Sequence, residues 1–198
     1  YITKYEKNKE YPIYTRKYMN LEAEEEILID VNELAKNYDY YQVSGISISP
    51  DNKKMAFGVD TLSRRIYTIK VKDLTNGRMY PDKIDGVNSS TTWASDSQTM
   101  FYTGKDRQTL RSDKIFRHSL GESQDDDILV YEEKDETFST FVYPSKSREY
   151  IMIGSSSTMA SEYRFLSSKT PLEPFKIIQK RERGLEYSPS HVGDMNYI

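Results

Sequence analysis

A repeated turn constrains the fold of this chain more than any other feature. Ser49-Pro50-Asp51-Asn52 separates two short apolar segments, and similar turns recur around Asp96, Lys146 and His191. The positions Asp51, Asp96, Lys146 and His191 are 45, 50 and 45 residues apart, about the length of one four-stranded β-propeller blade. Proline presets φ at such a corner, and Asp and Asn tolerate its tight backbone. Four turns in phase favour repeated blades over a β-sandwich whose turns share this spacing by coincidence.

Alternation of apolar and polar residues marks strands on both sides of each turn, as in residues 65–73. The pattern predicts an all-β chain, a partial β-propeller of about four four-stranded blades. A brief helical turn is expected at residues 32–35. The predicted blade units of this single domain are 1–44, 45–90, 91–140 and 141–186, with 187–198 starting the next. Because the chain starts without Met in one predicted strand and ends in another, we expect it to be a piece of a longer protein.

Composition excludes several classes of function. The net charge is −3 and no stripe of Lys and Arg is interleaved with aromatic residues, so a nucleic-acid partner is not expected. No apolar run is long enough for a membrane span, and no secretion signal is visible. The absence of Cys excludes disulfides and fits a reducing compartment. We therefore expect a cytoplasmic location without a membrane partner, and leave a periplasmic one open.

The chain offers no recognisable catalytic apparatus. Its nearest approach to the Gly-x-Ser-x-Gly elbow of α/β-hydrolases is Gly45-Ile46-Ser47-Ile48-Ser49, which lacks the final glycine and leads into a turn. His118 and His191 are the only imidazoles, lack zinc-site spacing, and are expected to be ordinary surface or interface residues. The run Asp125-Asp126-Asp127 lacks the spacing of a calcium loop. We therefore predict no catalytic residue, no metal and no cofactor.

Several longer stretches, in order along nearly the whole chain, carry a family resemblance. They are Lys9-Glu10-Tyr11-Pro12-Ile13-Tyr14, residues 26–35, Asp60-Thr61-Leu62-Ser63-Arg64-Arg65-Ile66-Tyr67, Trp93-Ala94-Ser95-Asp96, Phe116-Arg117-His118, residues 130–138, Ser161-Glu162-Tyr163-Arg164 and residues 181–187. Together they resemble the oligopeptidase B (protease II) group of the prolyl oligopeptidase family of serine peptidases. The resemblance implies a seven-bladed propeller that caps an α/β-hydrolase domain, with the catalytic Ser, Asp and His all in the hydrolase domain.

The resemblance covers only the first half of such a cap, and the hydrolase domain is missing. It implies that the parent protein cleaves short peptides after Arg or Lys, that the propeller gates and size-filters substrates, and that this fragment is inactive alone. The implied partners are the C-terminal α/β-hydrolase domain of the same parent and short basic peptides. The alternatives are a free-standing propeller that serves as an interaction scaffold without enzymatic activity, and the propeller of a dipeptidyl peptidase.

If the resemblance to this family holds, two groups of charged residues are candidate site residues. Arg64 and Arg65 are predicted to contact carboxylates across the domain interface, against the alternative that they pair within their own blade. Glu132, Glu133 and Asp135 are predicted to line an acidic loop seen by a cationic peptide, against the alternative of a solvated loop. A partial ring also leaves unpaired strand edges, so self-association through these edges is expected.

Overall fold

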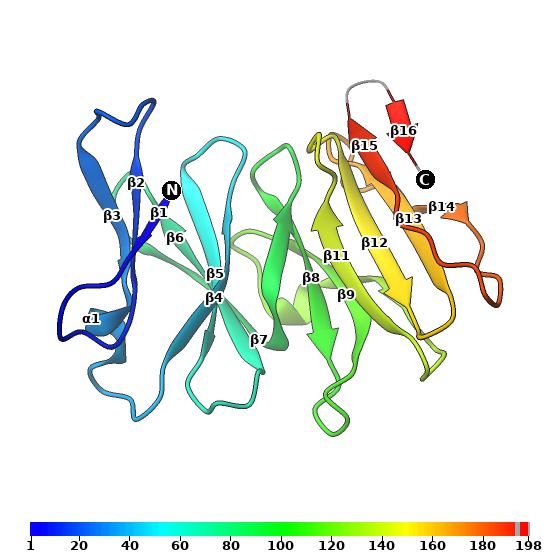
Figure 1. The fold of residues 1–198 in the computed structure, drawn as a ribbon, viewed down its shortest axis with the longest axis horizontal. Coiled ribbons are helices and arrows are strands. Elements are labelled where there is room, and N and C mark those ends of the chain that lie inside the picture. Colours follow the sequence, from blue (N-terminus) through cyan, green and yellow to red (C-terminus); the bar gives the residue numbers. More distant parts are fainter. Residues whose placement is uncertain (193–194, 198) are drawn as a thin grey trace.

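The computed structural model describes residues 1–192 and 195–197, and it consists of antiparallel sheets arranged side by side (Figure 1). The first sheet contains β1 (Ile2–Lys4), β2 (Ile13–Lys17) and β3 (Glu25–Asp30) in that order. The short helix α1 (Val31–Ala35) follows, and it begins where the Asp30 carboxylate accepts a hydrogen bond from the Asn32 amide at 2.9 Å. The predicted helical turn at residues 32–35 is confirmed.

The second sheet has seven strands in reverse order of sequence, from β10 to β4. They are β4 (Gln42–Ile48), β5 (Lys54–Asp60), β6 (Tyr67–Asp73), β7 (Met79–Trp93), β8 (Thr99–Lys105), β9 (Ser112–Ser119) and β10 (Ile128–Glu132), with the short 3₁₀ helix η1 (Gln124–Asp126) between the last two. The long strand β7 pairs with β6 along its first half and with β8 along its second, with a register shift between Val87 and Thr91. It therefore closes one four-stranded unit and opens the next.

The third sheet contains β11 (Ser139–Pro144), β12 (Tyr150–Ser156), β13 (Ser161–Ser167) and β14 (Lys176–Gln179), and a hairpin of β15 (Ser190–Val192) and β16 (Met195–Tyr197) follows. We define the first blade as β1–β3, the second as β4 to the first half of β7, the third as the second half of β7 to β10, and the fourth as β11–β14. The predicted all-β partial propeller is confirmed. The exact unit boundaries and the association through strand edges stay predictions.

The turns that revealed the repeat share one backbone geometry. Asn52, Ser97 and Arg148 have φ values of 59°, 56° and 63°, and each amide donates a hydrogen bond to the carbonyl oxygen three residues earlier. This left-handed conformation is uncommon for residues other than glycine, and Asn tolerates it best. The same turn therefore joins the first two strands of the second, third and fourth blades.

The structure corrects the phase of the last two repeats. Ser147, not Lys146, occupies the place of Asp51 and Asp96, because its hydroxyl accepts the amide hydrogen bond two residues ahead, from Glu149 at 3.2 Å. His191 lies within β15 and not in a turn. The sequence match failed there because short polar motifs of this kind are too common to fix the position of a turn.

The core lies between neighbouring blades. Buried alternate residues of β6, namely Tyr67, Ile69 and Val71, illustrate the period of two that places one face of each strand inside. Three apolar clusters fill the seams between the first and second, second and third, and third and fourth blades. The seam at β4 and β7 is so close that a Cβ on Gly45 would lie 2.1 Å from the Ser89 carbonyl oxygen.

Candidate functional surfaces of the propeller

The two ends of the blades carry different kinds of connection. The turns at residues 49–54, 94–99 and 145–150 lie along the upper edge in Figure 1, and we call this the turn end. The loops at residues 60–67 and 105–112 lie along the lower edge, which we call the loop end. Residues on loops that a rigid scaffold holds are the usual carriers of function, so both ends are candidate contact surfaces.

Arg64 and Arg65 lie on the exposed β5–β6 loop at the loop end, and a buried carboxylate holds this loop. Asp60 Oδ1 accepts the Leu62 amide and Oδ2 accepts the Arg65 amide, both at 2.8 Å. The ammonium group of Lys105, from the neighbouring blade, donates to the Arg65 carbonyl oxygen at 2.7 Å. The backbone of the loop is therefore fixed, while both guanidinium groups remain exposed.

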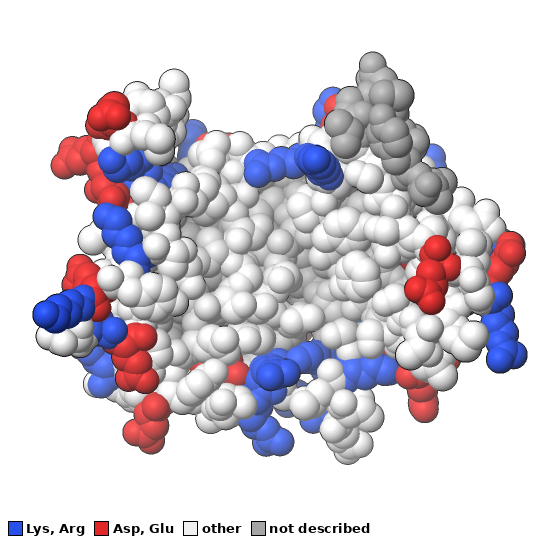
Figure 2. All heavy atoms as spheres, in the orientation of Figure 1, with Lys and Arg blue, Asp and Glu red and all other residues white. Residues whose placement is uncertain are grey.

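No ion pair within the described part of the chain uses Arg64 or Arg65, although ion pairs surround the loop end. Arg107, on the β8–β9 loop, lies close to Gly86 and shares a shallow groove with Arg64. Figure 2 shows Lys and Arg side chains gathered along the lower edge of this face. The loop end therefore presents positive charge suited to carboxylates of a partner surface, and the predicted interdomain contact stays a prediction.

The three predicted acidic residues occupy different environments. The Glu133 side chain is buried, and its Oε2 lies 2.6 Å from Arg181 Nη2. Burial raises the pKa of Glu133, but the hydrogen bonds from Arg181, the Tyr131 hydroxyl and the Asp135 amide, together with the charge of Arg181, outweigh burial and lower the pKa overall. Glu132 and Asp135 are exposed, with Glu132 Oε1 3.7 Å from Lys114 Nζ. Contact of these residues with a cationic peptide stays a prediction, for which Glu133 would have to leave Arg181.

Arg181 is the centre of a network that joins the third and fourth blades. Besides Glu133, its guanidinium contacts Glu162 of β13 at 3.3 Å and lies 4.0 Å from the centroid of the Phe138 ring. Glu162 also pairs with Arg164 at 2.5 Å. The sequence contains no spacing signal for this network, because its members come from three separate segments. It fixes the β10–β11 loop and the chain that follows β14.

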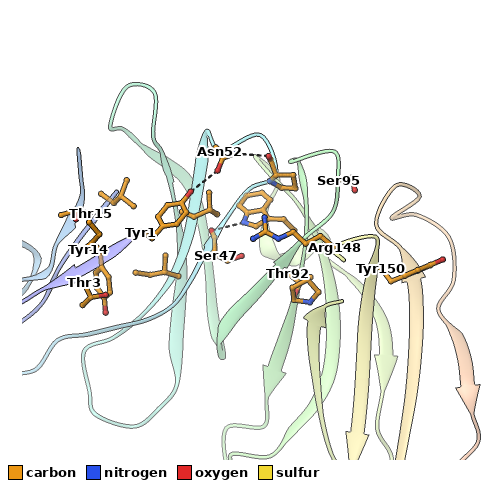
Figure 3. Close-up of a pocket in the computed structure, with 17 residues that line it drawn as sticks. Tyr1, Thr3, Tyr14, Thr15, Ser47, Asn52, Thr92, Ser95, Arg148 and Tyr150 are labelled. Atoms are coloured by element: carbon orange, nitrogen blue, oxygen red, sulfur yellow. Dashed lines mark hydrogen bonds between the residues drawn. The ribbon is translucent and has the colours of Figure 1, made fainter. Parts of the chain in front are cut away.

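A groove of about 500 Å³ opens near the turn end, between the first and fourth blades (Figure 3). Trp93 Nε1 donates to the Ser47 carbonyl oxygen at 3.2 Å, and the Tyr1 hydroxyl donates to Asn52 Oδ1 at 3.1 Å. Arg148 extends across the groove toward these residues (Figure 3). The described residues of the lining contribute aromatic, aliphatic and hydroxyl side chains but no carboxylate. The groove therefore suits a peptide backbone and apolar side chains. These lining residues provide no negative charge for a basic side chain.

His118 contradicts the prediction that it is an ordinary surface or interface residue. Its imidazole is buried in the third blade, where Nε2 lies 2.9 Å from Asp82 Oδ1 and Nδ1 lies 2.6 Å from Asp127 Oδ1. The Tyr102 hydroxyl donates to the other oxygen of Asp127 at 2.6 Å. Burial lowers the pKa of His118, but the hydrogen bonds with Asp127 and Asp82 outweigh it and raise the pKa overall. The prediction failed because Asp82 is distant in sequence.

His191, the other imidazole, lies on β15 of the following hairpin and contacts the fourth blade. Its Nδ1 lies 2.7 Å from the Ser147 hydroxyl, and its ring meets Tyr150 edge-on. Within the described residues, no group of three or more His, Asp or Glu side chains is arranged to hold a metal ion. None of the helices described is long and apolar enough to span a membrane.

Comparison with known proteins identifies this architecture. A family model described as the N-terminal β-propeller domain of prolyl oligopeptidase matches residues 1–198. The chain is 38% identical over 172 residues to dipeptidyl aminopeptidase BI of Pseudoxanthomonas mexicana, which covers 87% of this chain and 24% of that protein. It is 34% identical over 201 residues to protease 2 of Moraxella lacunata, which covers 98% of this chain and 29% of that protein. The chain thus spans 24% and 29% of the length of these two relatives.

Solved structures agree with the sequence relatives. Oligopeptidase B from Leishmania major superposes with a TM-score of 0.89 at 31% identity, over 96% of this chain and 28% of that one. Oligopeptidase B from Trypanosoma brucei, in a closed form with covalently bound antipain, gives 0.87 at 27% identity, over 97% and 27%. The resemblance found in the sequence is confirmed. Matched along its whole length by the family model, the chain belongs to the prolyl oligopeptidase family and corresponds to its N-terminal β-propeller domain.

Proposed function

We propose that this chain is part of the propeller cap of an oligopeptidase B-like serine endopeptidase, and that the full-length protein cleaves short peptides after Arg or Lys. The observation that carries the proposal is similarity along nearly the whole chain to protease 2 and to two oligopeptidase B structures. Those proteins are much longer than this chain, which leaves room for a catalytic domain. Serine attack and acyl transfer would take place there, and this chain alone would be inactive.

In this proposal the propeller acts by exclusion and by docking. Its blades wall off the catalytic chamber, so that short peptides enter and folded proteins do not. The rigid β5–β6 loop presents Arg64 and Arg65 to carboxylates of the catalytic domain, where bidentate pairs hold the closed form. Carboxylates of the catalytic domain would select Arg or Lys at the cleaved bond, and the described residues that line the groove near the turn end add no carboxylate of their own.

A second candidate is a dipeptidyl aminopeptidase, which removes dipeptides from a free N-terminus. It is favoured by one observation, the 38% identity to dipeptidyl aminopeptidase BI over most of this chain. The two candidates share the propeller and the serine chemistry but differ in what they require of the substrate. An endopeptidase accepts a blocked N-terminus, whereas a dipeptidyl aminopeptidase needs a free amine.

The test is cleavage of two fluorogenic Arg-Arg substrates by the full-length protein, one with a blocked and one with a free N-terminus. A serine-directed inhibitor provides the control for mechanism. Cleavage of the blocked substrate that the inhibitor abolishes supports the endopeptidase. Cleavage of the free substrate alone moves the assignment to a dipeptidyl aminopeptidase. Absence of any inhibitor-sensitive cleavage contradicts both and favours a propeller that serves as an interaction scaffold.

A further inference from the structure

The β5–β6 loop carries a pair of basic residues on an exposed loop, where peptidases commonly cut folded proteins. Arg64 and Arg65 are exposed, and Leu62 beside them is 75% exposed. Exposed loop tips are the preferred sites of proteolytic nicking in folded proteins. A protein that meets peptidases specific for basic residues, or is one, therefore carries a vulnerable sequence at its own loop end.

The conformation of the loop opposes cleavage. Peptidases bind the residues around the cleaved bond in an extended conformation, as a strand that pairs with the enzyme. Ser63 and Arg65 instead both have φ of 55°, in the left-handed region that extended chains do not visit. Cleavage after Arg64 or after Arg65 therefore requires the loop to open first.

Three hydrogen bonds resist that opening. The carboxylate of Asp60, only 1% exposed, accepts the amides of Leu62 and Arg65 at 2.8 Å each. Lys105 donates to the Arg65 carbonyl oxygen at 2.7 Å. The carbon of the same carbonyl group is the atom that a nucleophile would attack to cut after Arg65. A buried acceptor whose hydrogen bonds are broken is costly to leave unpaired, so the closed loop is strongly favoured.

We propose that Asp60 and Lys105 form a latch that masks the peptide bonds after Arg64 and Arg65 from peptidases specific for basic residues. Hydrolysis after Arg65 would consume one water and leave a new carboxylate on Arg65 and a new amine on Ile66. Protection of the uncovered loop against foreign peptidases rests on the loop geometry, and the proposed contact with the catalytic domain would add to it in the closed form. Because that contact does not involve the Asp60 carboxylate, the Asp60→Ala comparison isolates the latch. Protection of the protein from its own activity rests, in addition, on the proposed function.

The neighbouring loop provides a matched control. Asp106 holds the β8–β9 loop in the same manner, since its Oδ1 accepts the amides of Gln108 and Thr109 at 2.9 and 2.7 Å. That loop contains Arg107 and also lies at the loop end. Replacing Asp106 by alanine therefore removes the same kind of carboxylate from a neighbouring basic loop and leaves the Asp60 contacts in place.

The experiment is native-state digestion of the full-length protein with trypsin, with cleavage sites and rates followed by mass spectrometry. A free peptide of residues 58–70 gives the unmasked rate. We expect the wild-type bonds after Arg64 and Arg65 to be cut at least about a hundredfold more slowly than in the peptide. Asp60→Ala should raise the rate at these bonds at least about tenfold. Asp106→Ala should leave it unchanged.

Wild-type cleavage within about tenfold of the free peptide would overturn the latch, and this result needs no variant. So would an Asp60→Ala protein that folds and is cut no faster after Arg64 and Arg65. Should that variant fail to fold, Lys105→Met replaces a less buried side chain and must raise cleavage after Arg65. Without trypsin, self-nicking of Asp60→Ala supports self-protection. If the Asp60→Ala protein is cut when trypsin is added but not by itself, the latch is upheld and self-protection is contradicted.

Discussion

Replacing His118 by phenylalanine keeps a ring of similar shape in the third blade and removes both nitrogen atoms. In the native protein these nitrogens lie 2.9 Å from Asp82 Oδ1 and 2.6 Å from Asp127 Oδ1. The imidazole and both carboxylates are almost completely shielded from water. The substitution therefore leaves two buried carboxylates without the imidazole nitrogens that they share.

The expected loss of stability depends on the hydrogen bonds that the two carboxylates retain. Breaking a buried ion pair by removing one partner typically costs about 3–5 kcal/mol. Asp82 keeps the Gly121 amide at 2.6 Å, and Asp127 keeps the Tyr102 hydroxyl at 2.6 Å. These remaining hydrogen bonds place the loss at the lower end, about 3 kcal/mol. Because about 1.4 kcal/mol corresponds to a tenfold change, the local opening equilibrium should rise about a hundredfold.

The same contacts give the wild type a defined pH dependence. The folded-state pKa of His118 lies above the ordinary value of 6.5, because the hydrogen bonds with the two carboxylates outweigh burial. The stability that the imidazolium contributes is therefore fully present below pH 6.5, and it is lost as the pH rises through the folded-state pKa. His118→Phe should lack this alkaline loss.

Hydrogen exchange of the full-length protein measures both effects locally. We expect amides of β9 and β10 to exchange about a hundredfold faster in His118→Phe at neutral pH. His191→Phe is the matched control, because His191 is also buried but meets a hydroxyl and an aromatic ring instead of two carboxylates, and it should leave β9 and β10 unchanged. Protection of β9 and β10 that is equal in the wild type and His118→Phe would refute the reasoning.

Three further substitutions test other parts of the account. Gly45→Ala should lower the melting temperature and reduce the free energy of unfolding by more than about 2 kcal/mol, because its Cβ would meet the Ser89 carbonyl oxygen. An unchanged melting temperature would contradict this close packing of β4 against β7. Arg181→Met should cost about 2–3 kcal/mol and speed exchange at residues 133–138, since it unpairs buried Glu133; equal exchange rates would count against the network. Arg64→Glu should preserve the fold but weaken closure, seen as lower peptidase activity with an altered salt response; wild-type activity and salt response would remove the proposed interface.

Much of the fold was predictable from local patterns. The turn at Asp51 and Asp96 combines residues that specify a tight reversal, and its spacing gave the blade period. The alternation in β6 placed its apolar face inside, as observed. These features are local, because turn chemistry and a period of two depend on residues close in sequence.

The parts that the sequence did not reveal depend on contacts between distant segments. His118 looked unremarkable because its partner Asp82 lies on a strand that the chain leaves long before β9. Arg181 lies far from Glu133 in sequence, so neither residue signalled the network. The role of Asp60 as the anchor of the arginine loop was likewise invisible, because an Asp before a loop is common. Only the fold brings these charges together.

We propose that this propeller caps a peptidase that cleaves short basic peptides and excludes larger ones. The direct measurement is cleavage by the full-length protein of a series of peptides of increasing length, each with one Arg-Arg site, ending with a folded protein that carries the same site on an exposed loop. The account predicts inhibitor-sensitive cleavage after Arg in the short peptides, a steep fall with length, and no cleavage of the folded protein. Cleavage that does not depend on length, or no cleavage of any peptide, would contradict it.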